Sequence, residues 1–81
     1  AIELRIVAAG ARRDLGELDA AVVTLQTNDL NTENVSWAIR LRYAYADALE
    51  AAGREDEARK WFKKCAELDI DETTDASERC E

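Results

Sequence analysis

The stretch that decides the fold is GREDEARKWFKKCAELD, residues 53–69. Its apolar residues recur at the i, i+3, i+4 and i+7 spacing of one helical face: Ala58, Trp61, Phe62 and Cys65. The acidic run before them stands where a helix has the positive end of its dipole. Gly53 precedes that run, as glycine does just past the end of an earlier helix. The stretch therefore predicts a turn followed by an amphipathic helix with a buried apolar face.

The residues before this turn predict a partner for that helix. Trp37 to Ala52 is rich in Ala, Leu and Tyr and contains no helix breaker. Together the two segments predict a helical hairpin. We expect Ala58 to be buried where the two helices approach closely, because its side chain is small, and Phe62 to lie in the core beside it.

The same pattern stands earlier in the chain, at a fixed offset of 37 residues. Nine of the first twenty-one residues recur identically after that offset. They are Ala1, Ile2, Leu4, Arg5, Ala9, Ala11, Gly16, Asp19 and Ala21, which recur as Ala38, Ile39, Leu41, Arg42, Ala46, Ala48, Gly53, Asp56 and Ala58. A period of roughly 20 to 50 residues is typical of a repeat architecture. The first copy therefore predicts a second hairpin, with a helix over Ile2 to Asp14, a turn at Gly16 and a buried Ala21.

The linking segments are polar. Residues 28–34 join the two units and are expected to hold a helix cap between Asn31 and Asn34. After residue 69 a second connector leads to Asp75 and Glu78, which have the N-cap and N3 spacing of a last short helix. We expect an all-α chain of about five helices, broken near residues 15–17, 29–34, 53–54 and 69–74.

At this point the second unit resembles a tetratricopeptide repeat. The residues that carry the resemblance are Tyr45-Ala46, Leu49, Ala58, Phe62 and the closing Cys65-Ala66-Glu67-Leu68-Asp69. Ile70 stands where the family usually has Pro, Arg42 where it often has Trp, and the period exceeds the usual 34 residues. The resemblance implies one domain over residues 1–81, an α-α superhelix with repeats at about 1–31 and 37–70 and a capping helix at about 74–81. It also implies an interaction scaffold in which the first helix of each pair lines a groove.

By the same resemblance, the groove face of the second hairpin carries four polar or aromatic residues: Arg40, Tyr43, Asp47 and Glu50. Their spacing places them on one side of a helix. The equivalent residues of the first hairpin are Glu3, Ile6, Gly10 and Arg13, and Ile6, Val7 and Tyr43 are expected to form an apolar strip. Two carboxylates against one arginine favour a basic or amphipathic helical segment as the partner. The alternative is an ordinary hydrated helix face.

Other chemistry is poorly supported by the sequence. The chain has no histidine, and Cys65 stands on the apolar stripe, so we expect no catalytic residue and a buried thiol. Asp69, Asp71, Thr73 and Asp75 alternate like a calcium loop, but the sixth position is Thr74 rather than Gly and the twelfth is Cys80 rather than Glu. We therefore predict no metal site and no cofactor.

Composition limits the class of partner. A net charge of −7 opposes general binding to nucleic acid or to an anionic membrane surface. No apolar run approaches the roughly 20 residues that a membrane-spanning helix needs. Two cysteines without a CxxC motif are typical of reduced thiols in a cytoplasmic protein.

We expect this chain to be part of a longer protein that binds a protein or peptide. Two alternatives stay open: a self-associating or capping segment of a longer solenoid, which includes a homodimer, and a regulatory domain attached to an enzyme or a DNA-binding domain.

Overall fold

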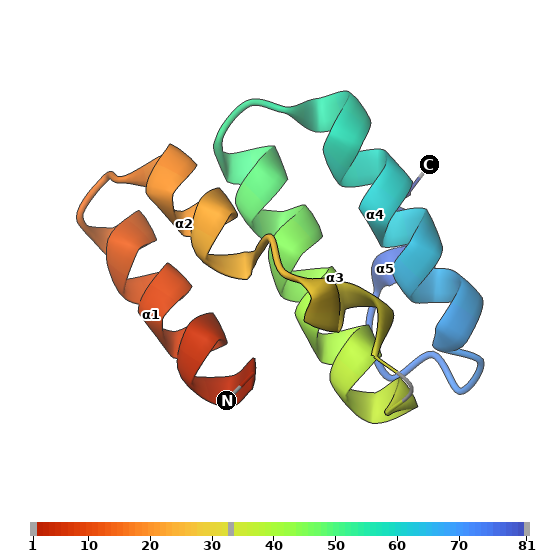
Figure 1. Cartoon of the computed structure of the whole chain (residues 1–81). Helices are drawn as coiled ribbons and strands as arrows, with labels where there is room; N and C mark the ends of the chain where they lie inside the picture. The colour runs from red at the N-terminus through yellow and green to blue at the C-terminus, as the bar shows by residue number, and fades with distance from the viewer. Residues whose placement is uncertain (1, 33, 81) are drawn as a thin grey trace.

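The computed structural model describes residues 2–32 and 34–80, and over these ranges the chain is helical, with short connections and no strand (Figure 1). The elements are α1 (Ile2–Asp14), α2 (Leu18–Leu25), the 3-10 helix η1 (Asn28–Asn31), α3 (Val35–Ala51), α4 (Glu55–Leu68) and α5 (Ala76–Arg79). The all-α prediction is confirmed.

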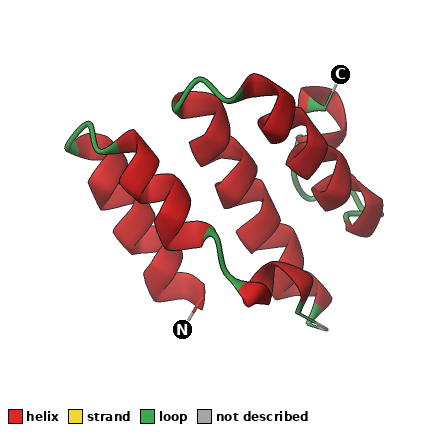
Figure 2. Ribbon diagram, turned by 45° about the horizontal axis from the view of Figure 1, so that its top comes forward, coloured by secondary structure: helices red, strands yellow, loops and turns green. Residues whose placement is uncertain are grey.

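The helices form two hairpins and a short terminal element. Helix α1 packs against α2, and α3 packs against α4. The first hairpin lies beside the second because α1 and α2 both contact α3, as Figures 1 and 2 show. Helix α5 packs against α4 and lies behind it in the view of Figure 1.

Both hairpins turn in the same way. Gly16 and Gly53 have positive φ angles of 79° and 81°, a conformation in which a side chain is strained. After α1, Glu17 N donates to Arg12 O at 2.8 Å and Gly16 N to Arg13 O at 2.9 Å. After α3, Arg54 N donates to Leu49 O at 2.9 Å and Gly53 N to Glu50 O at 3.0 Å. Each turn is thus a Schellman motif that satisfies the last carbonyls of its helix.

The predicted core residues are buried. Ala21 and Phe62 have no exposed surface, and Ala58 is 2% exposed. Cys65 is fully buried as well, and its Sγ donates to Ile39 O at 3.3 Å. Trp61 is half-buried, with its ring edge-to-face against Tyr45 at 5.2 Å between centroids.

Element boundaries differ from the prediction in three places. Helix α3 begins at Val35, two residues before Trp37, because Asn34 caps it by accepting from Trp37 N at 3.2 Å. The connector at 28–34 contains η1, whose first turn is capped by Thr27. Helix α5 occupies only Ala76–Arg79 of the predicted 74–81, and residue 81, like residue 1, lies outside the described residues.

Helices long and apolar enough to cross a bilayer are absent from the described part of the chain.

Candidate partner-binding site

Helix α3 presents three of the four predicted site residues to α5. Tyr43, Asp47 and Glu50 follow one another along one face of α3 and converge on Arg79. The guanidinium of Arg79 donates to Tyr43 Oη at 2.8 Å, to Asp47 Oδ1 at 2.9 Å and to Glu50 Oε1 at 2.7 Å. One cation therefore meets three oxygen acceptors from successive turns of a single helix.

The same guanidinium lies on aromatic rings. It stands 4.3 Å above the centre of the Phe62 ring and 5.4 Å from that of Tyr43. The two rings meet edge-to-face at 72°, with centroids 5.5 Å apart. Aromatic faces attract cations, and guanidinium stacks on them well because it is planar. We call Tyr43, Asp47, Glu50, Phe62 and Arg79 the Arg79 cluster.

Asp47 connects three helices. Besides Arg79 of α5, its carboxylate accepts a hydrogen bond from Arg13 of α1 at 2.8 Å between Nη1 and Oδ2. Burial alone would raise the pKa of Asp47, but the hydrogen bonds from Arg13 and Arg79 outweigh it and hold the pKa below its ordinary value. Asp47 is therefore ionised at neutral pH.

Arg79 is held equally firmly in its charged form. Partial burial would lower the pKa of Arg79, but its bonds to Asp47, Tyr43 and Glu50 raise it above the ordinary value. Its side chain is only 24% exposed.

Tyr43 also reaches the connector before α5. Its hydroxyl donates to Asp75 Oδ1 at 2.6 Å, and the pKa of Tyr43 is raised by burial and by this hydrogen bond. Asp75 occupies the N-cap position of α5 but makes no side-chain capping bond. Asp75 thus stands at the N-cap position that the sequence predicted for the last helix, but its carboxylate accepts from Tyr43 instead of forming a capping bond.

Arg40 stands apart from the Arg79 cluster. It pairs with Glu3 of α1, the residue 37 positions earlier, and so links the two hairpins. A second link is the Arg13–Asp47 pair beside a hollow of about 70 Å³ lined in part by Ile6, Gly10 and Asp47. Of the predicted apolar strip, Ile6 and Tyr43 are half-buried, whereas Val7 is 69% exposed.

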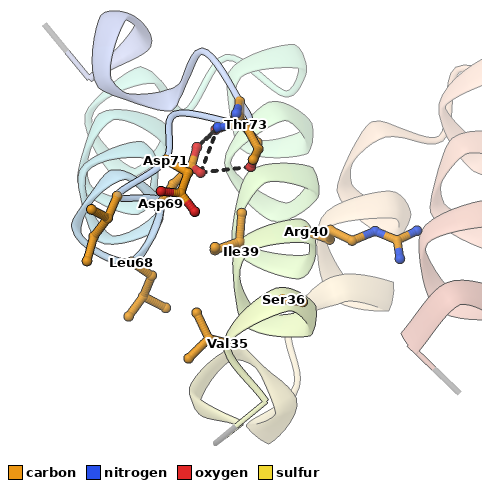
Figure 3. A pocket seen from close by; sticks show the side chains of 10 residues that line it. Val35, Ser36, Ile39, Arg40, Leu68, Asp69, Asp71 and Thr73 are labelled. Carbon is orange, nitrogen blue, oxygen red and sulfur yellow. Dashed lines mark hydrogen bonds between the residues drawn. The ribbon is translucent and has the colours of Figure 1, made fainter.

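A larger hollow of about 650 Å³ lies between the start of α3 and the α4–α5 connector (Figure 3). Its apolar lining comes from Val35, Ile39, Leu68 and Ile70. Figure 3 shows Arg40 directed toward the first hairpin rather than across the hollow. Such a surface can accept an aliphatic side chain.

Asp69 borders this hollow, but its carboxylate is hydrogen-bonded within the loop that follows α4. One carboxylate oxygen accepts from the backbone N and hydroxyl of Thr73 at 2.9 and 2.7 Å, and the other from those of Thr74 at 2.8 and 2.6 Å. The residues described contain no group of three His, Cys, Asp or Glu side chains placed to hold a metal ion. With both oxygens of Asp69 bonded, the arrangement organises a loop.

Sequence reasoning missed Arg79. The signal that could have found it is the repeat period, since Arg5, Arg42 and Arg79 stand 37 residues apart. Each donates from a helix to a neighbouring element: Arg5 to Thr24 O, Arg42 to Leu30 O and Lys64 O, and Arg79 to α3. Helix α5 thus begins where a third unit would begin.

Comparisons of the chain with protein-family models, with curated proteins and with solved structures found no match.

Proposed function

We propose that the chain is a protein-interaction module of the tetratricopeptide type, which binds a peptide or protein segment on the face of α1 and α3. The observation that carries the proposal is that α3 holds α5 through the Arg79 cluster. The side chains of α3 supply three acceptors, and the cluster supplies two aromatic rings, to a short helix that belongs to neither hairpin. A surface that holds one short helix in this way has the chemistry to hold another.

Three features support the tetratricopeptide-type assignment. The two hairpins share the Schellman turn at Gly16 and Gly53. Ala21 and Ala58 are buried at equivalent positions of the second helices. Arg79 of α5 continues the 37-residue period of Arg5 and Arg42.

The proposal is tested by using the chain as bait. We compare the parent with a Tyr43→Ala, Asp47→Lys double variant, which changes the face of α3. The matched control is Glu67→Lys, which makes the same charge change at an exposed position of α4. We expect a set of proteins that the parent and control capture and the double variant loses. If the double variant, shown to be folded by circular dichroism, retains every protein captured by the parent, this face is not the binding site.

A second candidate function, self-association, is favoured by the outer side of α1. An exposed apolar stripe runs along it at helical spacing: Leu4, Ala8, Ala11 and Leu15. Leu4 is 70% and Leu15 73% exposed, whereas Ala9 on the opposite side is buried. Helix α1 therefore has two apolar sides, and one of them meets no other helix within residues 2–32 and 34–80.

Light scattering across a concentration series separates the two functions. Self-association predicts a dimer that Leu4→Glu, Leu15→Glu dissociates, because charge at an apolar interface costs desolvation. A chain that stays monomeric at hundreds of micromolar excludes this function.

A further inference from the structure

The Arg79 cluster has the features of a guanidinium site. Its acceptors come from Tyr43, Asp47 and Glu50 at 2.7 to 2.9 Å, and the Phe62 ring forms its floor at 4.3 Å. Planar donors in a fixed fork and an aromatic face beneath them suit arginine rather than lysine, whose ammonium is a strongly hydrated point charge. The geometry of the site therefore fits the guanidinium of arginine better than the ammonium of lysine.

The helix that fills this site is short. Helix α5 has four residues, and its buried residue is Ala76. Beyond Ala76, its attachments to the hairpins include Arg79 and the Tyr43–Asp75 hydrogen bond. Short terminal elements with few buried contacts open at low free-energy cost.

Opening α5 would leave an acidic, aromatic surface. Glu50 would lose the Arg79 partner and Asp47 would keep only Arg13, while the rings of Tyr43 and Phe62 would be uncovered. The chain carries a net charge of −7, which attracts cationic ligands over distance.

We propose that the Arg79 cluster recognises an arginine of a helical partner segment, and that α5 occupies this site in the free chain until the partner's arginine replaces Arg79. The inference rests on the proposed function and specifies arginine as the partner side chain that the face of α3 binds. Helix α5 then competes with the partner for the same site. The apparent affinity for the partner is the intrinsic affinity multiplied by the fraction of chains in which α5 has left the site.

The test uses the whole chain and two small probes of equal charge, N-acetyl-arginine amide and N-acetyl-lysine amide. The variant Arg79→Ala empties the site, and Arg79→Gln serves where the alanine variant fails to fold. Binding is followed by the NMR signals of the Tyr43 and Phe62 rings. We expect the arginine probe to shift both signals in the emptied variant, with an affinity about tenfold or more above that for the parent, whose site is filled. The lysine probe should bind about tenfold more weakly than the arginine probe.

Replacement is tested in the parent through Cys80, which follows Arg79 and is half-buried, while Cys65 is fully buried. The arginine probe should accelerate modification of Cys80 by a thiol reagent, and the lysine probe should not. An unchanged rate at a probe concentration about a hundredfold above the dissociation constant of the emptied variant overturns replacement.

Recognition of arginine is overturned if, in a folded Arg79 variant, the NMR signals of the Tyr43 and Phe62 rings do not shift with the arginine probe. It is also overturned if they shift equally with the lysine probe. Such a result leaves the interaction function intact when the bait comparison still shows loss with the Tyr43→Ala, Asp47→Lys variant. If that comparison fails as well, the proposed function fails with it.

Discussion

Asp69 is a buried carboxylate whose four hydrogen bonds fix the loop between α4 and α5. Hydrogen bonds lower the pKa of Asp69 from 3.8 to about 2. The hydroxyl of Thr74 contributes most, followed by the hydroxyl of Thr73 and the backbone N–H groups of the same two residues. A lowered pKa in the folded state means that Asp69 stabilises the fold above its unfolded pKa. That contribution is lost as the pH falls from about 4 toward 2.

The substitution Asp69→Asn should therefore lower the free energy of unfolding by about 2 kcal/mol at pH 7, since it removes a charged acceptor. The difference between the parent and this variant should shrink as the pH falls below about 4. Denaturant unfolding at several pH values measures it. Asp71→Asn, at an exposed position of the same loop, is the matched control and should show little change. A difference that stays constant down to pH 2 would contradict the assignment.

Ala58 of α4 is buried in the core, with 2% of its surface exposed. Ala58→Leu should destabilise the chain by about 1–3 kcal/mol, because the added carbons overpack the core. The thermal midpoint measures the effect, and Lys60→Leu on the exposed side of α4 is the control. Equal midpoints for the two variants would show that α4 does not pack in this register.

At the scale of elements, three glycines allow a matched comparison. Gly53 has a φ of 81°, whereas Gly10 lies inside α1, and a Cβ added to either meets no atom within 4 Å. Gly53→Ala should therefore cost about 1–2 kcal/mol through backbone strain alone. Gly10→Ala should stabilise by about 0.5–1 kcal/mol, because alanine restricts the unfolded chain and favours helix. Gly16→Ala should behave like Gly53→Ala. Opposite signs in chemical denaturation are the expected outcome, and a stabilising Gly53→Ala would refute the turn geometry.

The hairpins could be predicted from the sequence because their signals are local. The stripe of Ala58, Phe62 and Cys65 and the glycine at position 53 determine α4 and the turn before it within a few residues. The N-cap position of α5 at Asp75 was predicted as well, but the length of α5 was not, since four residues are too few to show a period. The contact of Arg79 with Tyr43 spans 36 positions, and no local pattern records it.

At the scale of the whole molecule, one carboxylate joins α1, α3 and α5. Asp47 receives Arg13 from one side and Arg79 from the other. The candidate face on α3 was predicted from the sequence, but its connection to both neighbours was not, because that depends on how the hairpins and α5 are placed in space. Arg40, expected beside the other three residues, pairs with Glu3 instead.

Asp47→Asn should consequently destabilise the packing of both α1 and α5. Hydrogen exchange should rise in α1 and α5 together, with a loss of about 1–2 kcal/mol, a value reduced for the partial exposure of the pair. Glu50→Gln is the matched control, since Glu50 contacts Arg79 and should affect α5 without affecting α1. Faster exchange in α5 alone after Asp47→Asn would show that the Arg13 contact contributes little.

The identical turns at Gly16 and Gly53 have a consequence for inheritance. A genetic crossover between the codon for Gly16 and the codon for Gly53 would join α1 directly to α4. The junction would fall inside a glycine turn of unchanged geometry. The reciprocal product would gain one complete hairpin with its helices still in phase. Gene segments that recombine at these points can therefore lengthen or shorten by whole structural units without producing a broken helix.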